Sequence, residues 1–202
     1  IKGAGGDGLR IMSSRRHPRW LRQRGLEPSV LFSMKKLVEH LSLHTVCESA
    51  QCPNQARCFS QGTATFLILG DICTRNCNFC AIKKGQPFSP DTDEPRNVAL
   101  AANRLELKHV VVTSVTRDDL PNGGAIHFAK TVDAIRQINP NTTVEVLVPD
   151  FQGSVEALQT VTNSVPEVIN HNIETVPRLY SEVRPQADYH RSLNLFRTVK
   201  LL

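Results

Sequence analysis

Cysteine is missing from most of this 202-residue sequence, because all six cysteines fall within 34 consecutive residues and the other 168 residues contain none. The sequence also lacks the apolar stretch of a secretory signal. Its length is enough for one domain with a core of its own. A disulfide framework, which suits small secreted domains, is therefore not expected.

Long apolar runs and aromatic residues are scarce as well. No stretch approaches the roughly 18 apolar residues that a membrane-spanning helix needs, so the sequence predicts no membrane span. Aromatic residues make up only 5% of the chain, which disfavours a nucleic-acid-binding surface built on stacking side chains. The apolar fraction of 40% and the charged fraction of 21% are ordinary for a globular domain.

Positive charge is concentrated near the beginning of the chain. Residues 1–36 hold nine Lys and Arg against two acidic residues, a net charge of +7, whereas the rest holds 15 against 17, a net charge of −2. A basic arm of this kind could bind an acidic partner or a nucleic acid. It could also be a mitochondrial targeting sequence or a solvated extension over the domain. We expect a bacterial cytoplasmic protein, or a mitochondrial matrix protein if the source is eukaryotic.

From residue 61 onward, the pattern alternates between strands and helices. Strands are predicted at 65–69, 109–115, 144–148 and 168–172, and helices at 95–107, 126–138 and 152–160, after an earlier helix at 31–43. Asp93 is the predicted cap of the helix that begins at Pro95. This order predicts an α/β fold with a parallel sheet or barrel.

Only four strand–helix units are predicted, which is too few for the eight units of a closed (β/α) barrel. We therefore expect a partial parallel (β/α) barrel that is truncated C-terminally. It would occupy residues 61–202, after an N-terminal basic extension and cysteine-rich segment at residues 1–60. The chain begins with Ile1, and residues 192–202 are expected to open a helix, so both ends are expected to be incomplete.

The cysteines form two triplets, which are Cys47, Cys52 and Cys58, and then Cys73, Cys77 and Cys80. Structural zinc usually takes four ligands from paired short spacings, and no histidine has a spacing that completes either triplet. Three thiolates on a short loop instead suit a four-iron four-sulfur cluster with one iron left open for another ligand. The second triplet follows the first predicted barrel strand, and the C-terminal ends of such strands carry the chemistry of parallel barrels.

The spacing Cys-x3-Cys-x2-Cys of the second triplet, with Phe79 before its last cysteine, resembles the signature of the radical S-adenosylmethionine superfamily. The resemblance implies that the open iron binds S-adenosylmethionine and that the reduced cluster cleaves it to a 5′-deoxyadenosyl radical. Such chemistry serves substrates with an unactivated methylene, which has no acidic proton for a general base to remove.

The first triplet, Cys-x4-Cys-x5-Cys, resembles the auxiliary-cluster motif of the lipoyl synthase family. Similar segments continue over residues 18–202 and include Thr45–Asn54, Gly62–Phe66, Thr113–Leu120, Pro149–Phe151, His171–Val176 and Val183–Pro185. The resemblance implies radical insertion of sulfur at C6 and C8 of a protein-bound octanoyl group. The first triplet would hold a sacrificial cluster that supplies the sulfur, and the second triplet the radical-generating one. The family's Arg-Ser-Ser-Tyr motif, which supplies a serine ligand, is missing and is expected beyond the chain.

Contacts to S-adenosylmethionine are also implied by the resemblance. Gly123 and Gly124 are expected at the methionine amino group, and a turn before the helix 126–138 is the structural alternative. Asn172 and Glu174 are candidates for the ribose hydroxyls. Arg184 is a candidate for the methionine carboxylate, since a guanidinium suits a carboxylate fork. A structural ion pair or hydrogen bond is the alternative for each of these last three.

The implied partners are octanoylated lipoyl carrier proteins, namely the glycine cleavage H protein and the E2 subunits of 2-oxoacid dehydrogenases. An electron donor and an iron–sulfur cluster carrier complete the set. Two alternatives stay open: another radical enzyme with an auxiliary cluster, such as a methylthiotransferase, and a zinc-stabilised nucleic-acid-binding module with a basic arm. The adjacent Asp118 and Asp119 are expected to cap loops or form hydrogen bonds, because radical chemistry needs no carboxylate pair.

Overall fold

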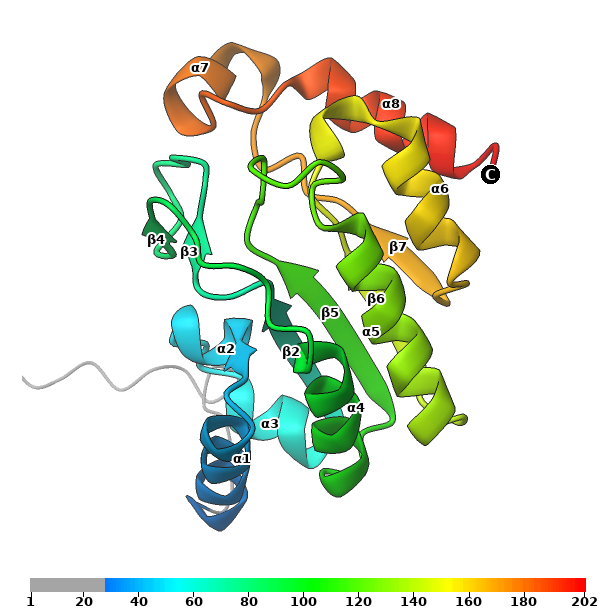
Figure 1. Cartoon of the computed structure of the whole chain (residues 1–202). Coiled ribbons are helices and arrows are strands. Elements are labelled where there is room, and N and C mark those ends of the chain that lie inside the picture. Colours follow the sequence, from blue (N-terminus) through cyan, green and yellow to red (C-terminus); the bar gives the residue numbers. More distant parts are fainter. Residues whose placement is uncertain (1–27) are drawn as a thin grey trace, which may run out of the picture.

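A computed structural model describes residues 28–202 of the chain (Figure 1). Residues 1–27 of the predicted basic arm lie outside the described residues. The elements are α1 (Pro28–His40), β1 (His44–Thr45), α2 (Val46–Ser49), α3 (Gln55–Ser60), β2 (Thr63–Ile68), β3 (Ile72–Cys73), β4 (Lys83–Lys84), α4 (Glu94–Arg104), β5 (His109–Ser114), α5 (Ala125–Ile138), β6 (Thr143–Leu147), η2 (Phe151–Gly153), α6 (Val155–Asn163), β7 (Val168–Asn170), η3 (Pro177–Leu179), α7 (Tyr180–Val183) and α8 (Tyr189–Val199).

The main sheet has five strands in the order β1-β2-β5-β6-β7. Strands β2, β5, β6 and β7 run parallel, and β1 pairs antiparallel with β2. Thr63 lies opposite His109, and His109 lies opposite Thr143, so the parallel strands start level with one another. Their C-terminal ends therefore meet at one edge of the sheet, where the loops that follow them are neighbours.

This sheet confirms the predicted α/β fold with parallel strands. All four predicted strands are present, and each ends within two residues of the predicted position. The sequence did not predict β1, nor the small parallel pair of β3 and β4. Each of these strands is two residues long, which is too short to leave a recognisable period in the sequence.

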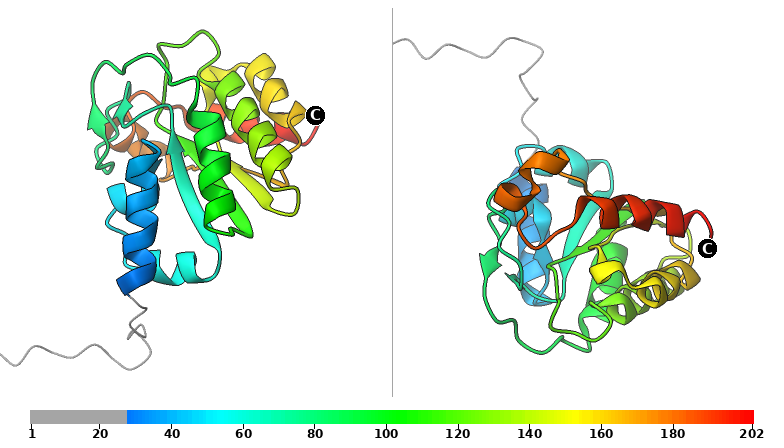
Figure 2. Two further views of the ribbon diagram at one scale, coloured as in Figure 1. Left: turned by 60° about the horizontal axis from the view of Figure 1, so that its bottom comes forward. Right: turned by 90° about the horizontal axis from the view of Figure 1, so that it is seen from above.

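Helices α4, α5 and α6 cover one face of the sheet (Figures 1 and 2). Along β2, Ala64 and Phe66 are buried in the hydrophobic core with these helices, whereas Thr65 between them is only partly buried. Successive strand residues point to opposite faces, so Thr65 points away from the helical layer. The same alternation recurs in β5 and β6.

The segment before the parallel strands packs onto the same core. Met34, Val38 and Leu43 are buried in one hydrophobic cluster with β2, and α2 and α3 also contact that strand. The domain boundary at residue 60 stays a prediction. None of the helices in the described part of the chain combines the length and apolarity that crossing a bilayer requires.

Four of the predicted helices have different ends in the structure. The helix expected over 31–43 is shifted to Pro28–His40, and the helix expected over 95–107 ends at Arg104. The helix expected over 152–160 is wrong at its start, because α6 begins at Val155 after the 3₁₀ turn η2. Gln152 has a φ of +53°, outside the helical region, and Ser154 caps α6 by accepting a hydrogen bond from the backbone of Ala157. The last helix was expected to open at residue 192, but α8 begins at Tyr189 and ends at Val199.

Candidate functional site

The first cysteine triplet lies on the face of β2 that the helical layer leaves free. Cys47 is in α2, Cys58 is in α3, and Cys52 is in the turn that joins them. The Cys47 thiol is hydrogen-bonded to Thr65, whose side chain points away from helices α4 to α6. The sequence segment folds locally because Thr45 caps α2 by accepting a hydrogen bond from the Glu48 backbone.

The three thiols of this triplet interact with one another. Burial raises the pKa of Cys47 above its ordinary value, and the neighbouring Cys52 and Cys58 raise it further, although hydrogen bonding to Thr65 opposes them. Three thiolates brought together repel each other, and a bound cationic iron centre removes that repulsion. The donor set therefore fits a shared metal centre.

The second triplet lies in the loops beyond the C-terminal ends of the parallel strands (Figure 1). Cys73 forms part of β3, and Cys77 and Cys80 follow in the loop that leads to β4. Neighbouring loops hold this segment in place. The Thr74 backbone and hydroxyl both donate to the Thr116 carbonyl, at 3.1 and 2.9 Å, and the Asn78 backbone donates to the Val183 carbonyl at 3.0 Å.

A buried arginine fixes the second triplet to two further loops. Arg75 donates to both carboxylate oxygens of Asp118, at 2.6 and 2.8 Å, and to Asp150 at 2.6 Å. Burial on its own lowers the pKa of Arg75, but these two carboxylates outweigh burial and raise it above its ordinary value. Asp118 thus forms an ion pair, in line with its expected hydrogen-bonding role. Sequence reasoning missed Arg75, although an arginine inside a cysteine loop is a signal for such a pair.

A polar cavity opens at the C-terminal ends of β5, β6 and β7. Its lining includes Ser114, Asn172, Glu174 and Arg184, so the structure brings together three of the residues predicted to bind S-adenosylmethionine. Among the described residues, only three buried side-chain N or O atoms have no hydrogen-bond partner, and two of them, Ser114 Oγ and Arg184 Nε, belong to this lining. A buried polar group left without a partner costs about 1–3 kcal/mol, so a polar ligand is favoured there.

Arg184 connects this cavity with the second triplet. Its guanidinium donates to the Asn172 carbonyl at 2.8 Å and also lies beside the Cys77 thiol. Burial raises the pKa of Cys77, Arg184 lowers it, and the nearby Cys73 and Cys80 raise it, with a net rise. The cavity is therefore adjacent to the cysteines of the second triplet.

Gly123 and Gly124 line other cavities than this one. Both have left-handed backbones, with φ values of +59° and +93°. A Cβ atom on Gly124 would lie 2.4 Å from Leu69 Cδ1, and one on Gly123 would lie 3.0 Å from Phe151 Cδ1. Turn geometry and close packing thus require glycine at both positions, and their predicted contact with a cofactor stays a prediction.

The six cysteines are the candidate metal ligands of the described residues. All six cysteines are free and partly buried. In residues 28–202, no three His, Cys, Asp or Glu side chains are grouped so as to hold one metal ion. A single zinc ion needs its thiolates within about 4 Å of one another, given its short Zn–S bonds. The described residues therefore show no site for a single zinc ion at either triplet, and the four-iron clusters stay a prediction.

Residues 67–201 match the family model of the Radical SAM superfamily. This range contains the second triplet, the cavity, the last two residues of β2 and the whole of β5, β6 and β7. The chain belongs to the Radical SAM superfamily. The predicted membership of the radical S-adenosylmethionine superfamily is thereby confirmed.

Within the superfamily, the chain is similar to lipoyl synthases. It is 60% identical over 187 residues to the lipoyl synthase of Caldanaerobacter subterraneus, covering 93% of this chain and 65% of that one. It is 59% identical to the enzyme of Oleidesulfovibrio alaskensis, covering 92% and 64%, and 53% identical to that of Caldicellulosiruptor saccharolyticus, covering 94% and 66%. The chain thus spans slightly less than two thirds of the length of these relatives.

The fold is also similar to that of a solved structure of another enzyme. The crystal structure of methylornithine synthase superposes with a TM-score of 0.50 at 13% sequence identity, over 83% of this chain and 52% of the other. At this identity the likeness concerns the fold alone. It agrees with the predicted partial barrel of the radical S-adenosylmethionine type.

Proposed function

We propose that the protein is a lipoyl synthase, which inserts two sulfur atoms at C6 and C8 of an octanoyl group attached to a carrier protein. The observation that carries the proposal is the presence of two separate triplets of free cysteines, one before β2 and one after it. One triplet lies on the uncovered face of β2, and the other lies beside a polar cavity. The identity of 53–60% to lipoyl synthases supports the same activity.

Each triplet has its own role in this proposal. Cys73, Cys77 and Cys80 hold a radical-generating four-iron four-sulfur cluster, and Cys47, Cys52 and Cys58 hold an auxiliary cluster of the same type. When bound, the two clusters and S-adenosylmethionine supply hydrogen-atom abstraction from unactivated carbon and a source of sulfur. The protein supplies the thiolates, the spacing between the triplets and a polar cavity that binds the cofactor.

The cavity side chains orient S-adenosylmethionine. Arg184 lies beside Cys77, so its guanidinium is placed to pair with the methionine carboxylate next to the cluster. Asn172 and Glu174 are exposed at the end of β7, where their polar groups suit ribose hydroxyls. Gly123 and Gly124 line other cavities, and their backbone contact with the methionine amino group is part of the proposal on the family resemblance alone.

The proposed partners follow from the reaction. The substrates are octanoylated lipoyl carrier proteins, such as the glycine cleavage H protein and the E2 subunits of 2-oxoacid dehydrogenases. The reaction also needs an electron donor, and a cluster carrier that rebuilds the auxiliary cluster. A bacterial cytoplasm provides all of them. This sequence contains no Arg-Ser-Ser-Tyr motif for the serine ligand that the family resemblance implies.

The two roles are separable by cysteine substitution in the full-length protein. Cys47→Ala is expected to keep the reductive cleavage of S-adenosylmethionine to 5′-deoxyadenosine within about twofold, because the second triplet is intact, and to form no lipoyl product. Cys73→Ala, the control, is expected to lose both activities. Loss of both activities in Cys47→Ala, or a lipoyl product from it, would contradict the division of roles. A methylthiolated RNA product would support the methylthiotransferase reading instead.

A further inference from the structure

Leu69 connects β2 to the second cysteine triplet in a strained conformation. Its φ is +67°, and the next residue, Gly70, has a φ of +88°. A left-handed backbone costs an L-residue with a side chain about 1–2 kcal/mol, so the surrounding structure must hold Leu69 in place. These two residues turn the chain out of the strand, and Cys73 follows four positions after Leu69.

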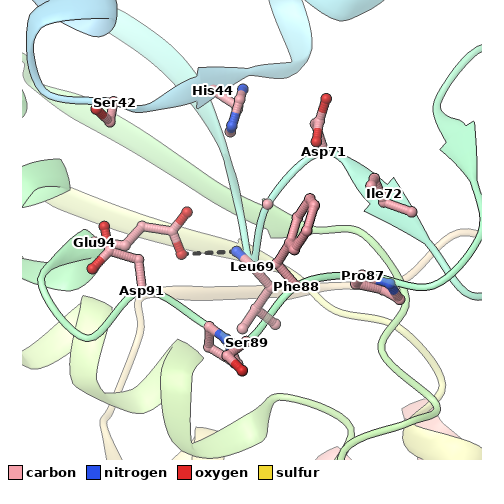
Figure 3. Close-up of a pocket in the computed structure, with 12 residues that line it drawn as sticks. Ser42, His44, Leu69, Asp71, Ile72, Pro87, Phe88, Ser89, Asp91 and Glu94 are labelled. Atoms are coloured by element: carbon pink, nitrogen blue, oxygen red, sulfur yellow. Dashed lines mark hydrogen bonds between the residues drawn. The ribbon is translucent and has the colours of Figure 1, made fainter.

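The Leu69 backbone N–H is bound by a buried carboxylate (Figure 3). Glu94, in the first turn of α4, is 5% exposed, and its Oε2 accepts the Leu69 N–H at 2.8 Å. The same oxygen lies 2.7 Å from His127 Nε2 on α5. A buried carboxylate is costly unless it is paired and hydrogen-bonded. The chemistry proposed above gives Glu94 no role.

The other side of Leu69 is held as well. Arg117 is 2% exposed, and its Nη1 donates to the Leu69 carbonyl at 3.3 Å. Asp119 fixes the same guanidinium with two hydrogen bonds of 2.8 Å. Gly124 leaves room for the buried Leu69 side chain. Both backbone groups of Leu69 therefore depend on side chains from other elements.

We propose that Glu94 is a positioning residue for the radical-generating cluster. Its carboxylate holds Leu69 in the left-handed conformation and so sets the direction in which the chain leaves β2 toward Cys73. The inference rests on the proposed function only in assigning that cluster to the second triplet. It concerns the loop geometry and requires no contact between Glu94 and the cluster.

The test compares three variants of Glu94 in the full-length protein, in a background where Cys47, Cys52 and Cys58 are all alanine, so that iron binds only at the second triplet. Glu94→Gln keeps an oxygen that accepts the Leu69 N–H but removes the charge. Glu94→Ala removes the acceptor, and Glu94→Asp keeps the charge but shortens the side chain. Glu156→Ala is the matched control, because Glu156 is an exposed acidic residue in the first turn of α6.

Two readouts are taken, iron bound per chain after anaerobic reconstitution and hydrogen exchange of the Leu69 amide in the iron-free protein. Glu94→Ala and Glu94→Asp are expected to speed Leu69 exchange by about tenfold, the effect of losing a buried hydrogen bond, and to lower bound iron by about threefold or more. Glu94→Gln is expected to restore both readouts to within about twofold of the parent. Glu156→Ala is expected to match the parent.

Parent-like iron binding in Glu94→Ala with fast Leu69 exchange would overturn the proposal, because the contact would then not govern the cluster loop. Equal losses of bound iron in Glu94→Gln and Glu94→Ala would also overturn the proposal. The negative charge of Glu94 would then matter, and its hydrogen bond from the Leu69 N–H would not. If the parent itself binds no iron at Cys73, Cys77 and Cys80, the proposed function fails. The exchange of Leu69 still tests the contact with Glu94 in that case.

Discussion

At the scale of single residues, Asp150 joins the loop after β6 to the second cysteine triplet. The carboxylate is 2% exposed and pairs with Arg75 at 2.6 Å and with Arg191 at 3.2 Å. Burial alone would raise the pKa of Asp150, but Arg75 above all, and then the Gln152 backbone N–H and Arg191, hold it below its ordinary value. The ion pairs thus favour the charged form in the folded protein.

This depressed pKa makes the loop sensitive to acid. Its contribution to stability is complete above the ordinary value of 3.8, and it is lost as the pH falls below that value toward the lower pKa of the folded state. Asp150→Asn is expected to lower the free energy of unfolding by about 2–3 kcal/mol at pH 7 and to flatten its fall below pH 4. Urea unfolding between pH 3 and pH 7 measures both, with the exposed Asp133→Asn as control. An unchanged pH slope would contradict the assignment.

Gly124 tests the packing around Leu69. Gly124→Ala adds a Cβ 2.4 Å from Leu69 Cδ1, whereas Gly153→Ala, also at a left-handed position, meets nothing closer than 3.6 Å. We expect a loss of about 1–2 kcal/mol for Gly153→Ala from backbone strain. Gly124→Ala should lose about 2–4 kcal/mol, because overpacking adds to that strain. Thermal unfolding compares the two, and equal losses would mean that Leu69 moves aside freely.

Chemistry at the residue scale was predictable only where it is local in sequence. The spacing of the six cysteines predicted both triplets, because ligands on one short loop stay close in any fold. The pair of Arg75 and Asp150 is separated by 75 residues, and Leu69 and Glu94 by 25. Such pairs depend on which strands become neighbours, and a single sequence does not specify that. The roles of Asn172, Glu174 and Arg184 stay predictions.

At the scale of elements, two helix caps that look alike in sequence differ in the structure. Ser154 caps α6 through a hydrogen bond of 3.1 Å from the Ala157 backbone. Asp93 occupies the same position before α4, but its side chain makes no capping hydrogen bond. The predicted place of Asp93 is therefore right, although its side chain does not cap the helix.

Ser154→Ala is expected to destabilise the protein by about 1 kcal/mol, because it leaves a helix N–H without its partner. Asp93→Ala is expected to cost only a few tenths of a kcal/mol, since it loses only a charge near the helix N-terminus. Chemical denaturation of both variants gives the comparison. A cost for Asp93→Ala as large as that for Ser154→Ala would show that Asp93 does cap α4 in solution.

The predictable elements are those with a clear period or a buried apolar run. Strands β2, β5 and β6 carry several buried apolar residues each, so their positions could be read from the sequence. The start of α6 could not, because η2 places Gln152 in a left-handed conformation within an otherwise helical pattern. The short helices α2 and α3 were also missed, since Pro53 between them interrupts any period.

At the scale of the whole molecule, one parallel sheet brings together segments that are distant in sequence. The loop of the second triplet is hydrogen-bonded to segments after β5 and after β7, through Thr116 and Val183. The first triplet lies along β2, the same strand that leads into the second triplet. The sheet thus provides both positions that a two-cluster enzyme needs.

The central claim is that each triplet holds its own four-iron cluster, and the number of irons bound per chain tests it most directly. Anaerobic reconstitution of the full-length protein is predicted to give about eight irons per chain. Changing either triplet to alanine should leave about four, whichever triplet is changed. Four irons in the unaltered protein, or tightly bound zinc in their place, would contradict the account.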